Sequence, residues 1–473
     1  MTELIDNTPF FKKKRYLVVL MAFLGYINLY TLRVNMSVAI VAMTDNKSII
    51  HDDNSETFEP EFDWSSKAKG YVLSSFFYGY ICTQIPGGIL ASKIGGQWVF
   101  GLGILGTAVM TLLTPILCYQ GIGYLILSRV IQGICSGLAY PSINMVYANY
   151  IPPIERSRTA SYGTSGIFVG TILGNFLSGL ISEYFGWEYI FYIFGAVAVL
   201  WYVLWYFTVK SGPDHDSWMS QGERDFIKKS IASQSGNKAQ TTKTPWKAIF
   251  TSIPVYAIAI SHFSYNWGYY TMLTQLPMYM RDILDFDVTK SGFLSALPYL
   301  VQTIIVYISG FLADFVQKKN ILTTTQVRKY FNTTSFVSQT IFLLIAAFVS
   351  NTPTIVACIS MTVGIGALAM SGWLANTLDI APQFGSIILG ISNTLATLPG
   401  IVSPILSGYI ASTPNSFEYR IIFIITCAIG VAGMTFYLFF ASAELQPWAV
   451  VESNGDIEKN KNTDKKAKNK FKE

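Results

Sequence analysis

The sequence predicts an all-α membrane protein with twelve transmembrane helices arranged as two six-helix bundles. First, 51% of the residues are hydrophobic and only 13% are charged, against about 25% charged in soluble domains. Second, apolar stretches of 18 or more residues recur along the whole chain, and each is long enough to span a bilayer. Third, one polar interruption near the middle divides these stretches into six and six.

The predicted spans are separated by short polar turns. They fall near residues 16–43, 70–91, 98–117, 122–149, 160–182, 189–208, 252–280, 291–313, 328–349, 354–375, 384–411 and 420–441. Residues 209–249 are rich in Lys, Ser, Gln and Thr, which predicts a flexible linker. The expected divisions are an N-terminal segment (1–15), a first bundle (16–208) with a long outer loop (44–66), the linker (209–249), a second bundle (250–441) and a tail (442–473).

The positive charges predict the orientation of the spans. An even number of spans places both termini on one side, and the segments on that side carry 25 of the 33 Lys and Arg residues, against 6 on the other side. Because cytoplasmic segments are enriched in Lys and Arg, we expect both termini and the linker in the cytoplasm. The 44–66 loop is then lumenal or extracellular, and its sequon at Asn46 predicts a glycosylation site.

Polar side chains follow one face of three predicted helices. Residues three, four or seven positions apart share a helix face. The stripes contain Tyr26, Tyr30, Arg33 and Ser37 on the first span, Arg129, Gln132, Ser136 and Tyr140 on the fourth, and His262, Asn266 and Tyr269 on the seventh. We expect the three stripes to converge on an aqueous cavity between helices.

Arg33 and Arg129 are the two cationic side chains that fall inside the predicted spans. Burying each costs about 2.5–3.5 kcal/mol on insertion scales, and no carboxylate lies in the outer or middle membrane layers of the predicted topology. The hypothesis is that both arginines bind an anionic substrate; the alternative is a structural role or snorkelling. For His262, a polar contact in helix packing and a contact to substrate or proton are both open.

Other residues are candidates for conformational change. GGILASKIGG (87–96) resembles SGFLADFVQKK (309–319), so Gly88 and Gly310 are expected in equivalent turns, with Lys93 and Asp314 nearby. Asp379 is a gate or turn candidate at a cytoplasmic end. Pro399 and Gly400 interrupt the eleventh span and favour bending there. The stripe Gly166, Gly170, Gly174 and Ser178 in the fifth span predicts tight helix packing.

Long strings of the sequence resemble one transporter family. They include LRVNMSVAIVAM (32–43), SSFFYGYICTQIPGGILASKIGG (74–96), HFSYNW (262–267), LDIAP (378–382) and GISNTLATLPGIVSP (390–404). The chain resembles the branch of the major facilitator superfamily that contains sialin, the vesicular glutamate transporters and the type I sodium–phosphate cotransporters. The resemblance implies the major facilitator fold, alternating access and anionic substrates, with the family's binding arginines at Arg33 and Arg129.

Two departures from the family pattern bear on ion coupling. Proton-coupled members carry a glutamate where this chain has Ser136, and the glutamate branch has a histidine where this chain has Leu73. A carboxylate that gains and loses a proton is a physical means of coupling. The sequence therefore favours transport driven by sodium or by membrane potential.

The predicted function is secondary active transport of inorganic phosphate or a small organic anion. The first alternative is a proton-coupled, sialin-like exporter of acidic sugars or amino acids, and the second is an anion channel. An enzyme is not expected, nor a metal site or a cofactor, apart from sodium as a coupling ion. We expect a monomer that contacts its small anionic substrate and the lipid bilayer but no nucleic acid, in the plasma membrane or an endolysosomal or vesicular membrane.

Overall fold

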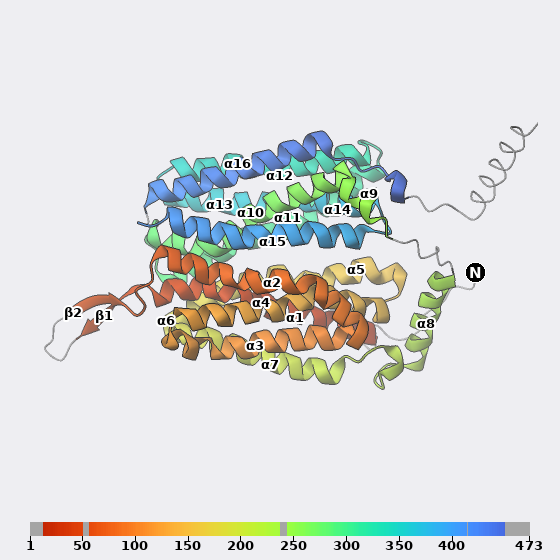
Figure 1. The fold of residues 1–473 in the computed structure, drawn as a ribbon, viewed down its shortest axis with the longest axis horizontal. Coiled ribbons are helices and arrows are strands. Elements are labelled where there is room, and N and C mark those ends of the chain that lie inside the picture. The colour runs from red at the N-terminus through yellow and green to blue at the C-terminus, as the bar shows by residue number, and fades with distance from the viewer. Residues whose placement is uncertain (1–12, 51–55, 237–243, 414, 450–473) are drawn as a thin grey trace, which may run out of the picture.

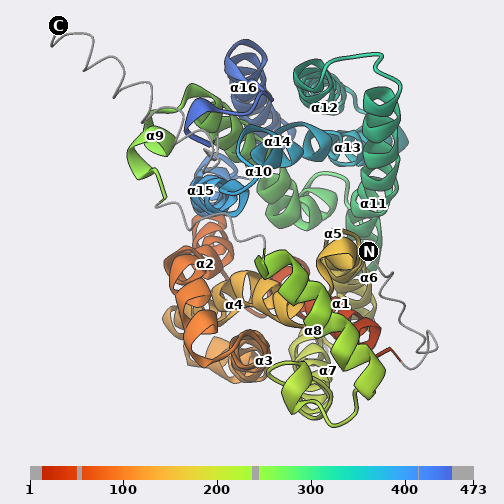
Figure 2. The same cartoon turned by 90° about the vertical axis from the view of Figure 1, so that its right-hand side faces the viewer.

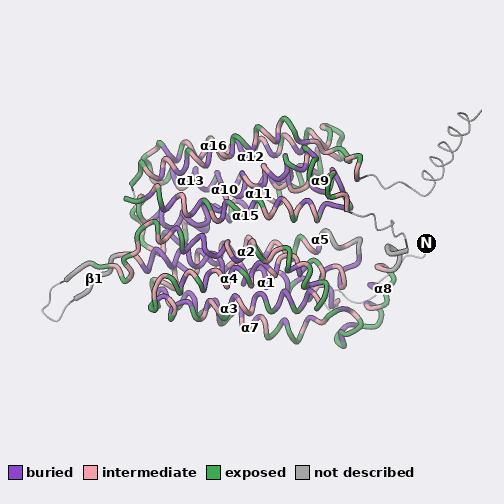
Figure 3. Tube along the Cα trace, in the orientation of Figure 1, coloured by how far each residue is buried: buried purple, intermediate pink, exposed green. Residues whose placement is uncertain are grey.

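Two groups of six long helical rods, one from each half of the chain, lie side by side (Figure 1). The computed structural model describes residues 13–50, 56–236, 244–413 and 415–449. Buried positions follow the inward faces of the rods, and exposed positions follow the outer ones (Figure 3). The first rod is central to its bundle, since most of its length is buried.

Each predicted span corresponds to one rod. The first bundle consists of α1 (Lys14–Met43), α2 (Ser66–Ile94), α3 (Gly96–Gln120), α4 (Ile122–Tyr150), α5 (Pro153–Thr164) continued by α6 (Gly166–Phe185), and α7 (Trp187–Thr208). The second consists of α10 (Ile253–Asp282), α11 (Val288–Lys318), α12 (Thr324–Phe348), α13 (Thr352–Gly366) continued by η3 (Met370–Leu374) and α14 (Ala375–Ile380), α15 (Gly385–Ile410) and α16 (Ser416–Phe440). The predicted all-α fold with twelve spans is confirmed.

Single glycines make the tightest turns between rods. Gly95, Gly121 and Gly186 lie between consecutive helices with φ of 99°, 125° and 102°. Side chains disfavour this left-handed region, whereas glycine enters it without steric cost. The chain can therefore reverse direction within one residue and place neighbouring rods antiparallel.

Ten rods in the described part of the chain are long and apolar enough to cross a membrane by length and composition alone. The other two rods are α2 and α10. Both face the opposite bundle along one side, and α10 carries buried polar residues such as His262, Asn266 and Gln275. Their lower hydropathy follows from this position, because one face of each helix contacts protein and a polar interior instead of lipid.

The two ends of the molecule differ in what they carry. The long loop forms an antiparallel hairpin of β1 (Asn46–Ile50) and β2 (Glu56–Pro60), which marks the hairpin end. The opposite end carries α5, α8 (Gln221–Gly236), α9 (Trp246–Thr251) and both ends of the described chain, and we call it the linker end (Figures 1 and 2). The hairpin was not predicted, because its strands are short and mostly polar.

Close contacts between the bundles gather in the hairpin half. A Cβ added to Gly70 of α2 would lie 2.6 Å from the Pro404 carbonyl oxygen of α15. A Cβ on Gly292 of α11 would lie 2.8 Å from the Asn175 carbonyl oxygen of α6. Arg281 also donates to Asp45 across the bundles, with Nη2 and Oδ1 2.6 Å apart. The hairpin end is therefore closed in this conformation.

The prediction that the whole linker is flexible is wrong. After η2 (Pro213–His215), α8 lies across the linker end of the first bundle (Figure 2). The buried Glu223 carboxylate accepts the backbone N–H of Lys14 at 2.7 Å and of Arg15 at 3.1 Å. Free N–H groups at a helix start need such acceptors. Glu223 thus caps α1 from a distant part of the chain, which local polar composition cannot reveal.

Gly88 and Gly310 do not occupy turns, and that prediction is also wrong. Both lie inside helices, because α2 continues to Ile94 and α11 to Lys318. These last turns extend the rods at the linker end, where apolar side chains such as Ile94 and Phe315 are exposed beside Lys93 and Asp314. The glycine stripe of the fifth span does pack as predicted: Gly166 and Gly170 lie against the backbone of Phe23 and Ile27 in α1.

Candidate functional site

A cavity of ≈ 160 Å³, here called the central cavity, lies between the two bundles. It is lined mainly by aromatic and amide side chains, from α1, α2, α4, α6, α10, η3 and α15. Its lining includes Tyr30, Tyr80, Tyr140, His262, Tyr265, Asn266, Tyr269, Tyr270, Trp373 and Asn393. Four of the predicted substrate-binding residues are therefore brought together here: Tyr30, His262, Asn266 and Tyr269.

Arg33 lies directly behind the tyrosines of the cavity wall. Its guanidinium carbon is 5.4 Å, 5.0 Å and 5.1 Å from the ring centroids of Tyr30, Tyr80 and Tyr270, which all line the central cavity. Two further rings, Phe76 and Phe77, complete an aromatic cage at 5.1 Å and 4.8 Å. Aromatic faces attract a guanidinium, and each such contact contributes about 0.5–2 kcal/mol.

The charge of Arg33 has no ionic partner in the described chain. The side chain is only 7% exposed, and its Nε and Nη2 atoms make no hydrogen bond. A buried donor without an acceptor is costly. Aromatic rings offset part of this cost but accept no strong hydrogen bond. The arrangement leaves donors that an oxyanion of a substrate can satisfy.

Arg129 is placed differently from the expectation that both arginines face the substrate. It does not line the central cavity. Its Nη1 donates to Gln132 Oε1 at 2.6 Å, and its Nη2 donates to the Arg33 carbonyl oxygen at 3.2 Å. The two guanidinium groups share one ring, since Arg129 is also 5.1 Å from Phe76. Arg129 therefore holds the backbone of α1 in place behind the cage.

Gln132 and Tyr26 also lie behind the cavity. Gln132 donates to Thr114 Oγ1 at 3.0 Å inside the first bundle. Tyr26 packs edge-on against Phe100 and Tyr140, and its buried hydroxyl has no partner. Neither residue lines the central cavity. Helical spacing placed Tyr26 on the same face as Tyr30, and Gln132 on the same face as Arg129. One face of a helix is wide enough to contact both the cavity and the interior of the bundle, so spacing alone cannot separate the two.

His262 and Asn266 connect α10 to α15 while they line the cavity. His262 Nδ1 is 3.2 Å from Ser392 Oγ, and its ring stacks on Trp373 with centroids 3.7 Å apart. Asn266 donates to the Ala396 carbonyl oxygen at 2.8 Å. Both open interpretations of His262 therefore keep support, since it has a packing partner and also reaches the cavity.

Trp373 and Asn393 were missed by the sequence analysis. Trp373 lies in η3, a π-helical turn that interrupts the tenth span. Such turns are rare and recur at functional sites. The Arg328 side chain holds this turn, because Nη1 donates to the Ser371 carbonyl oxygen at 2.9 Å. The sequence MSGWL carries no signal of a π turn that periodicity could detect.

The gating candidates fall into three groups. Asp379 pairs with Arg328 at 2.6 Å, beside the π turn, whereas Lys93 and Asp314 are exposed at the linker end. Pro399 and Gly400 are buried in α15. The missing side chain of Gly400 makes room for the Phe77 ring of the other bundle. This glycine therefore connects α15 directly to the Arg33 cage.

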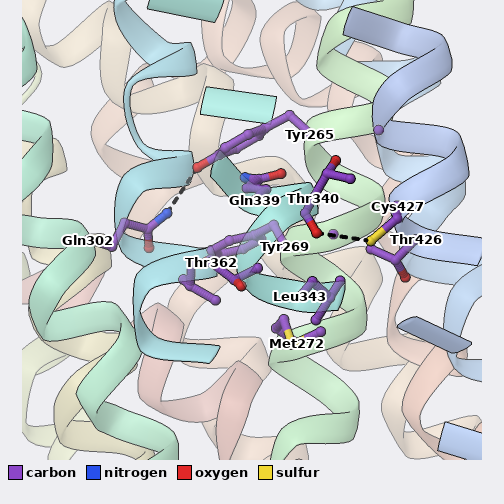
Figure 4. A pocket seen from close by; sticks show the side chains of 13 residues that line it. Tyr265, Tyr269, Met272, Gln302, Gln339, Thr340, Leu343, Thr362, Thr426 and Cys427 are labelled. Carbon is purple, nitrogen blue, oxygen red and sulfur yellow. Dashed lines mark hydrogen bonds between the residues drawn. The ribbon is translucent and has the colours of Figure 1, made fainter. Parts of the chain in front are cut away.

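A second, smaller cavity of ≈ 20 Å³ lies inside the second bundle, and we call it the side chamber (Figure 4). Tyr265 and Tyr269 line both this chamber and the central cavity. Their rings stack with centroids 6.3 Å apart. The two tyrosines thus form a wall between the two spaces.

Comparisons with known proteins identify relatives along nearly the whole chain. The family model of the Major Facilitator Superfamily matches residues 18–327. Human sialin is 38% identical over 466 residues, which cover 95% of this chain and 94% of sialin. Human vesicular glutamate transporter 2 is 36% identical over 455 residues, covering 96% of this chain and 78% of that protein.

Solved structures with the same fold include two transporters. A bacterial homologue of the human lysosomal transporter Spinster, in an inward-facing and occupied conformation, has a TM-score of 0.69 at 14% identity. The alignment covers 90% of this chain and 96% of that one. A D-xylose–proton symporter has a TM-score of 0.67 at 16% identity, covering 90% and 98%. At these identities the likeness concerns the fold alone.

We predict that replacing Arg33 lowers uptake, whereas replacing Arg129 lowers the abundance of the protein. Arg33→Met keeps the length of the side chain and removes a charge without a partner, so abundance should stay near wild type while uptake falls to background. Arg129→Met leaves Gln132 Oε1 without its donor, at about 1–3 kcal/mol, and removes the bonds to the Leu32 and Arg33 carbonyl oxygens of α1, so abundance should fall. Uptake normalised to protein abundance separates the two; normal uptake by Arg33→Met would make Arg33 structural.

A second prediction compares two tyrosines one turn apart on α1. Tyr30→Phe removes a hydroxyl from the cavity wall beside Arg33, and we expect the KM for the substrate to rise about tenfold, equivalent to 1.4 kcal/mol. Tyr26→Phe removes a buried hydroxyl that has no partner, and KM should not change. Concentration-dependent uptake of both variants measures this. Equal KM values for the two variants would contradict the assignment of the cavity wall.

Proposed function

The chain belongs to the major facilitator superfamily, and from this premise we propose that it transports a small anion by alternating access. The observation that carries the proposal is Arg33, a buried cation without an ionic partner beside a cavity that both bundles line. Planar guanidinium groups bind oxyanions through two parallel hydrogen bonds. Substrates with a phosphate or carboxylate group match this chemistry, so inorganic phosphate and small organic anions are the candidates.

The conformation of the chain fits a carrier better than a channel. The bundles are closed at the hairpin end by helix contacts and by the pair of Arg281 with Asp45. A carrier exposes its site to one side at a time, through rigid-body movement of one bundle against the other. A channel would instead need a path open at both ends. Ionic currents far above the turnover rate of a carrier, together with the absence of substrate counterflow across the membrane, would support a channel.

We propose sodium or membrane potential as the driving force. Ser136 occupies the position of the family's fourth-helix glutamate and is buried within the first bundle. A hydroxyl does not exchange a proton near neutral pH, so this position cannot carry the proton in this chain. A proton-coupled exporter of acidic sugars or amino acids is the second candidate, supported by the similarity to sialin and by His262 in the cavity wall.

The third prediction tests the driving force in proteoliposomes that contain the purified protein. We expect accumulation of phosphate, glutamate or a sialic acid under an imposed sodium gradient or membrane potential. A pH gradient at clamped voltage, without sodium, should drive little accumulation because Ser136 cannot replace the family glutamate. Liposomes without protein are the control. Strong accumulation under the proton gradient alone would favour the sialin-like exporter, and His262→Gln would then identify its proton carrier.

The fourth prediction concerns the orientation of the molecule, with both termini in the cytoplasm. The hairpin would then be lumenal or extracellular, and Asn46 at the start of β1 is its sequon. In a eukaryotic host we expect glycosidase treatment to shift the wild-type band and to leave Asn46→Gln unchanged. A shift that persists in Asn46→Gln would contradict this site. Asn35 and Asn332, the other sequon asparagines, are fully buried in helices and act as internal controls.

A further inference from the structure

A cavity of ≈ 130 Å³ lies at the outer edge of the first bundle, where α3 begins and α7 ends, and we call it the interfacial cavity. The two helices lie side by side there, away from the second bundle (Figures 1 and 2). The interfacial cavity shares no lining residue with the central cavity. It therefore plays no part in the site derived so far.

The lining of the interfacial cavity changes character at the predicted ends of the third and sixth spans, near residues 98 and 208. The side within the spans is aromatic, with Trp98, Tyr202, Trp205 and Tyr206. The side beyond the spans is polar, with Gln97, Lys210, Ser211 and His215. Because tryptophan and tyrosine are enriched at the level of lipid headgroups, this division places the cavity at the membrane–water interface.

The aromatic side of the cavity is accessible from the lipid-facing surface. Trp98 is 41% exposed and Tyr206 is 45% exposed, and their rings meet edge to face with centroids 5.8 Å apart. Leu102, four residues after Trp98, and Val203, three residues before Tyr206, are also exposed. Residues three or four positions apart share a helix face. An apolar surface therefore continues from the cavity along both helices, where an acyl chain can follow it.

Lys210 supplies a positive charge that no carboxylate of the described chain neutralises. Its Nζ donates to the Tyr206 carbonyl oxygen at 3.1 Å, which uses one of its three protons. Asp214 and Asp216, which follow in the chain, pair with other lysines. The described residues that line the cavity include no carboxylate. The charge of Lys210 is therefore available to an anionic ligand.

The backbone that carries these polar groups is fixed to α4. The buried Tyr150 hydroxyl accepts the backbone N–H of Lys210 at 3.1 Å, and Asn149 donates to the Ser211 carbonyl oxygen at 3.1 Å. Ser211 Oγ accepts a hydrogen bond from Gln97 Nε2 at 2.9 Å, so its own proton remains available. Groups held in place before binding lose less freedom when a ligand arrives.

We propose that the interfacial cavity binds the headgroup of an anionic phospholipid. The lipid phosphate pairs with Lys210 and accepts a hydrogen bond from the Ser211 hydroxyl. The headgroup rests on the rings of Trp98 and Tyr206, and an acyl chain follows the apolar surface of α3 and α7. An amphipathic ligand matches the aromatic and polar halves of the lining, and a net negative headgroup matches the charge that the chain leaves unpaired.

The proposal is independent of the transported substrate. In the orientation proposed above, the cavity faces the cytoplasmic leaflet, where anionic lipids are concentrated and where basic pockets between helices bind their headgroups. Binding itself does not depend on this orientation. A bound headgroup would hold residues 209–211, where the linker leaves α7, against the first bundle.

The experiment counts lipids bound to the purified protein by native mass spectrometry in a neutral detergent. We expect wild type to bind phosphatidylglycerol saturably and about fivefold more tightly than phosphatidylcholine, the effect of one lysine near an anionic surface. Lys210→Gln keeps a polar side chain of similar length but removes the charge. Its affinity for phosphatidylglycerol should fall about fivefold, and its preference over phosphatidylcholine should disappear.

The matched control is Lys318→Gln at the end of α11. Lys318 is exposed at the linker end like the polar half of the cavity, but it belongs to the second bundle and lines no part of the cavity. Its lipid binding should equal that of the wild type. Equal effects of Lys210→Gln and Lys318→Gln, or no preference of the wild type for phosphatidylglycerol, would overturn the proposal.

Two further measurements locate the site and identify the source of the phosphate. A phosphatidylglycerol analogue with a photoreactive headgroup should label peptides that contain Trp98 or residues 202–215, and labelling confined to other segments would contradict the site. An excess of inorganic phosphate should not displace the lipid, because it lacks the acyl chains. Displacement by inorganic phosphate in the wild type, lost in Lys210→Gln, would show that the cavity takes a free anion instead of a lipid.

Discussion

The central constraint in this structure is the buried charge of Arg33. A guanidinium in the membrane interior costs several kcal/mol unless its surroundings compensate, and no carboxylate of the described chain pairs with it. Five aromatic rings surround the charge instead, four from α1 and α2 and one, Tyr270, from α10. The residue can exist at this depth only while both bundles supply rings, so the charge and the packing of the bundles depend on each other.

This dependence connects binding to movement. An oxyanion that pairs with Arg33 has to pass or displace a ring of the cavity wall, because Tyr30, Tyr80 and Tyr270 stand between the guanidinium and the cavity. Phe77, another ring of the cage, packs where Gly400 of α15 has no side chain. Neutralising the charge would weaken the attraction that holds Tyr270 to the first bundle. The contacts that bind the proposed substrate are therefore also contacts between the two moving bodies.

The sequence predicted the spans, and it predicted that Arg33 is a buried charge without a carboxylate partner, for one physical reason: both follow from solvation. Apolar runs of sufficient length must cross the membrane, and a charge inside one must be compensated. Arg129 shows where this reasoning ends. Like Arg33, it is a charged residue inside an apolar segment, yet it donates to backbone carbonyl oxygens of α1. Because every helix carries backbone carbonyl oxygens, the sequence cannot show which of them an arginine will contact. Likewise, local composition gave no sign that Glu223 caps α1 or that MSGWL forms a π turn.

The two arginines have similar sequence patterns but different contacts: Arg129 donates to the backbone of α1, whereas Arg33 keeps donors without partners. Arg129 satisfies carbonyl oxygens of α1 at Leu32 and at Arg33 itself, so it fixes the helix at the position from which the other arginine projects. Both Nη atoms of Arg129 donate to the α1 backbone or to Gln132, only its Nε is left without a partner, and the residue does not line the central cavity. Because Arg33 has donors without partners, its burial remains costly, and an anion of the proposed kind would remove that cost. In the proposed site, the scaffold held by Arg129 would keep the geometry when no ligand is bound, and the unpaired donors of Arg33 beside the tyrosines of the cavity wall would supply the affinity for an anion.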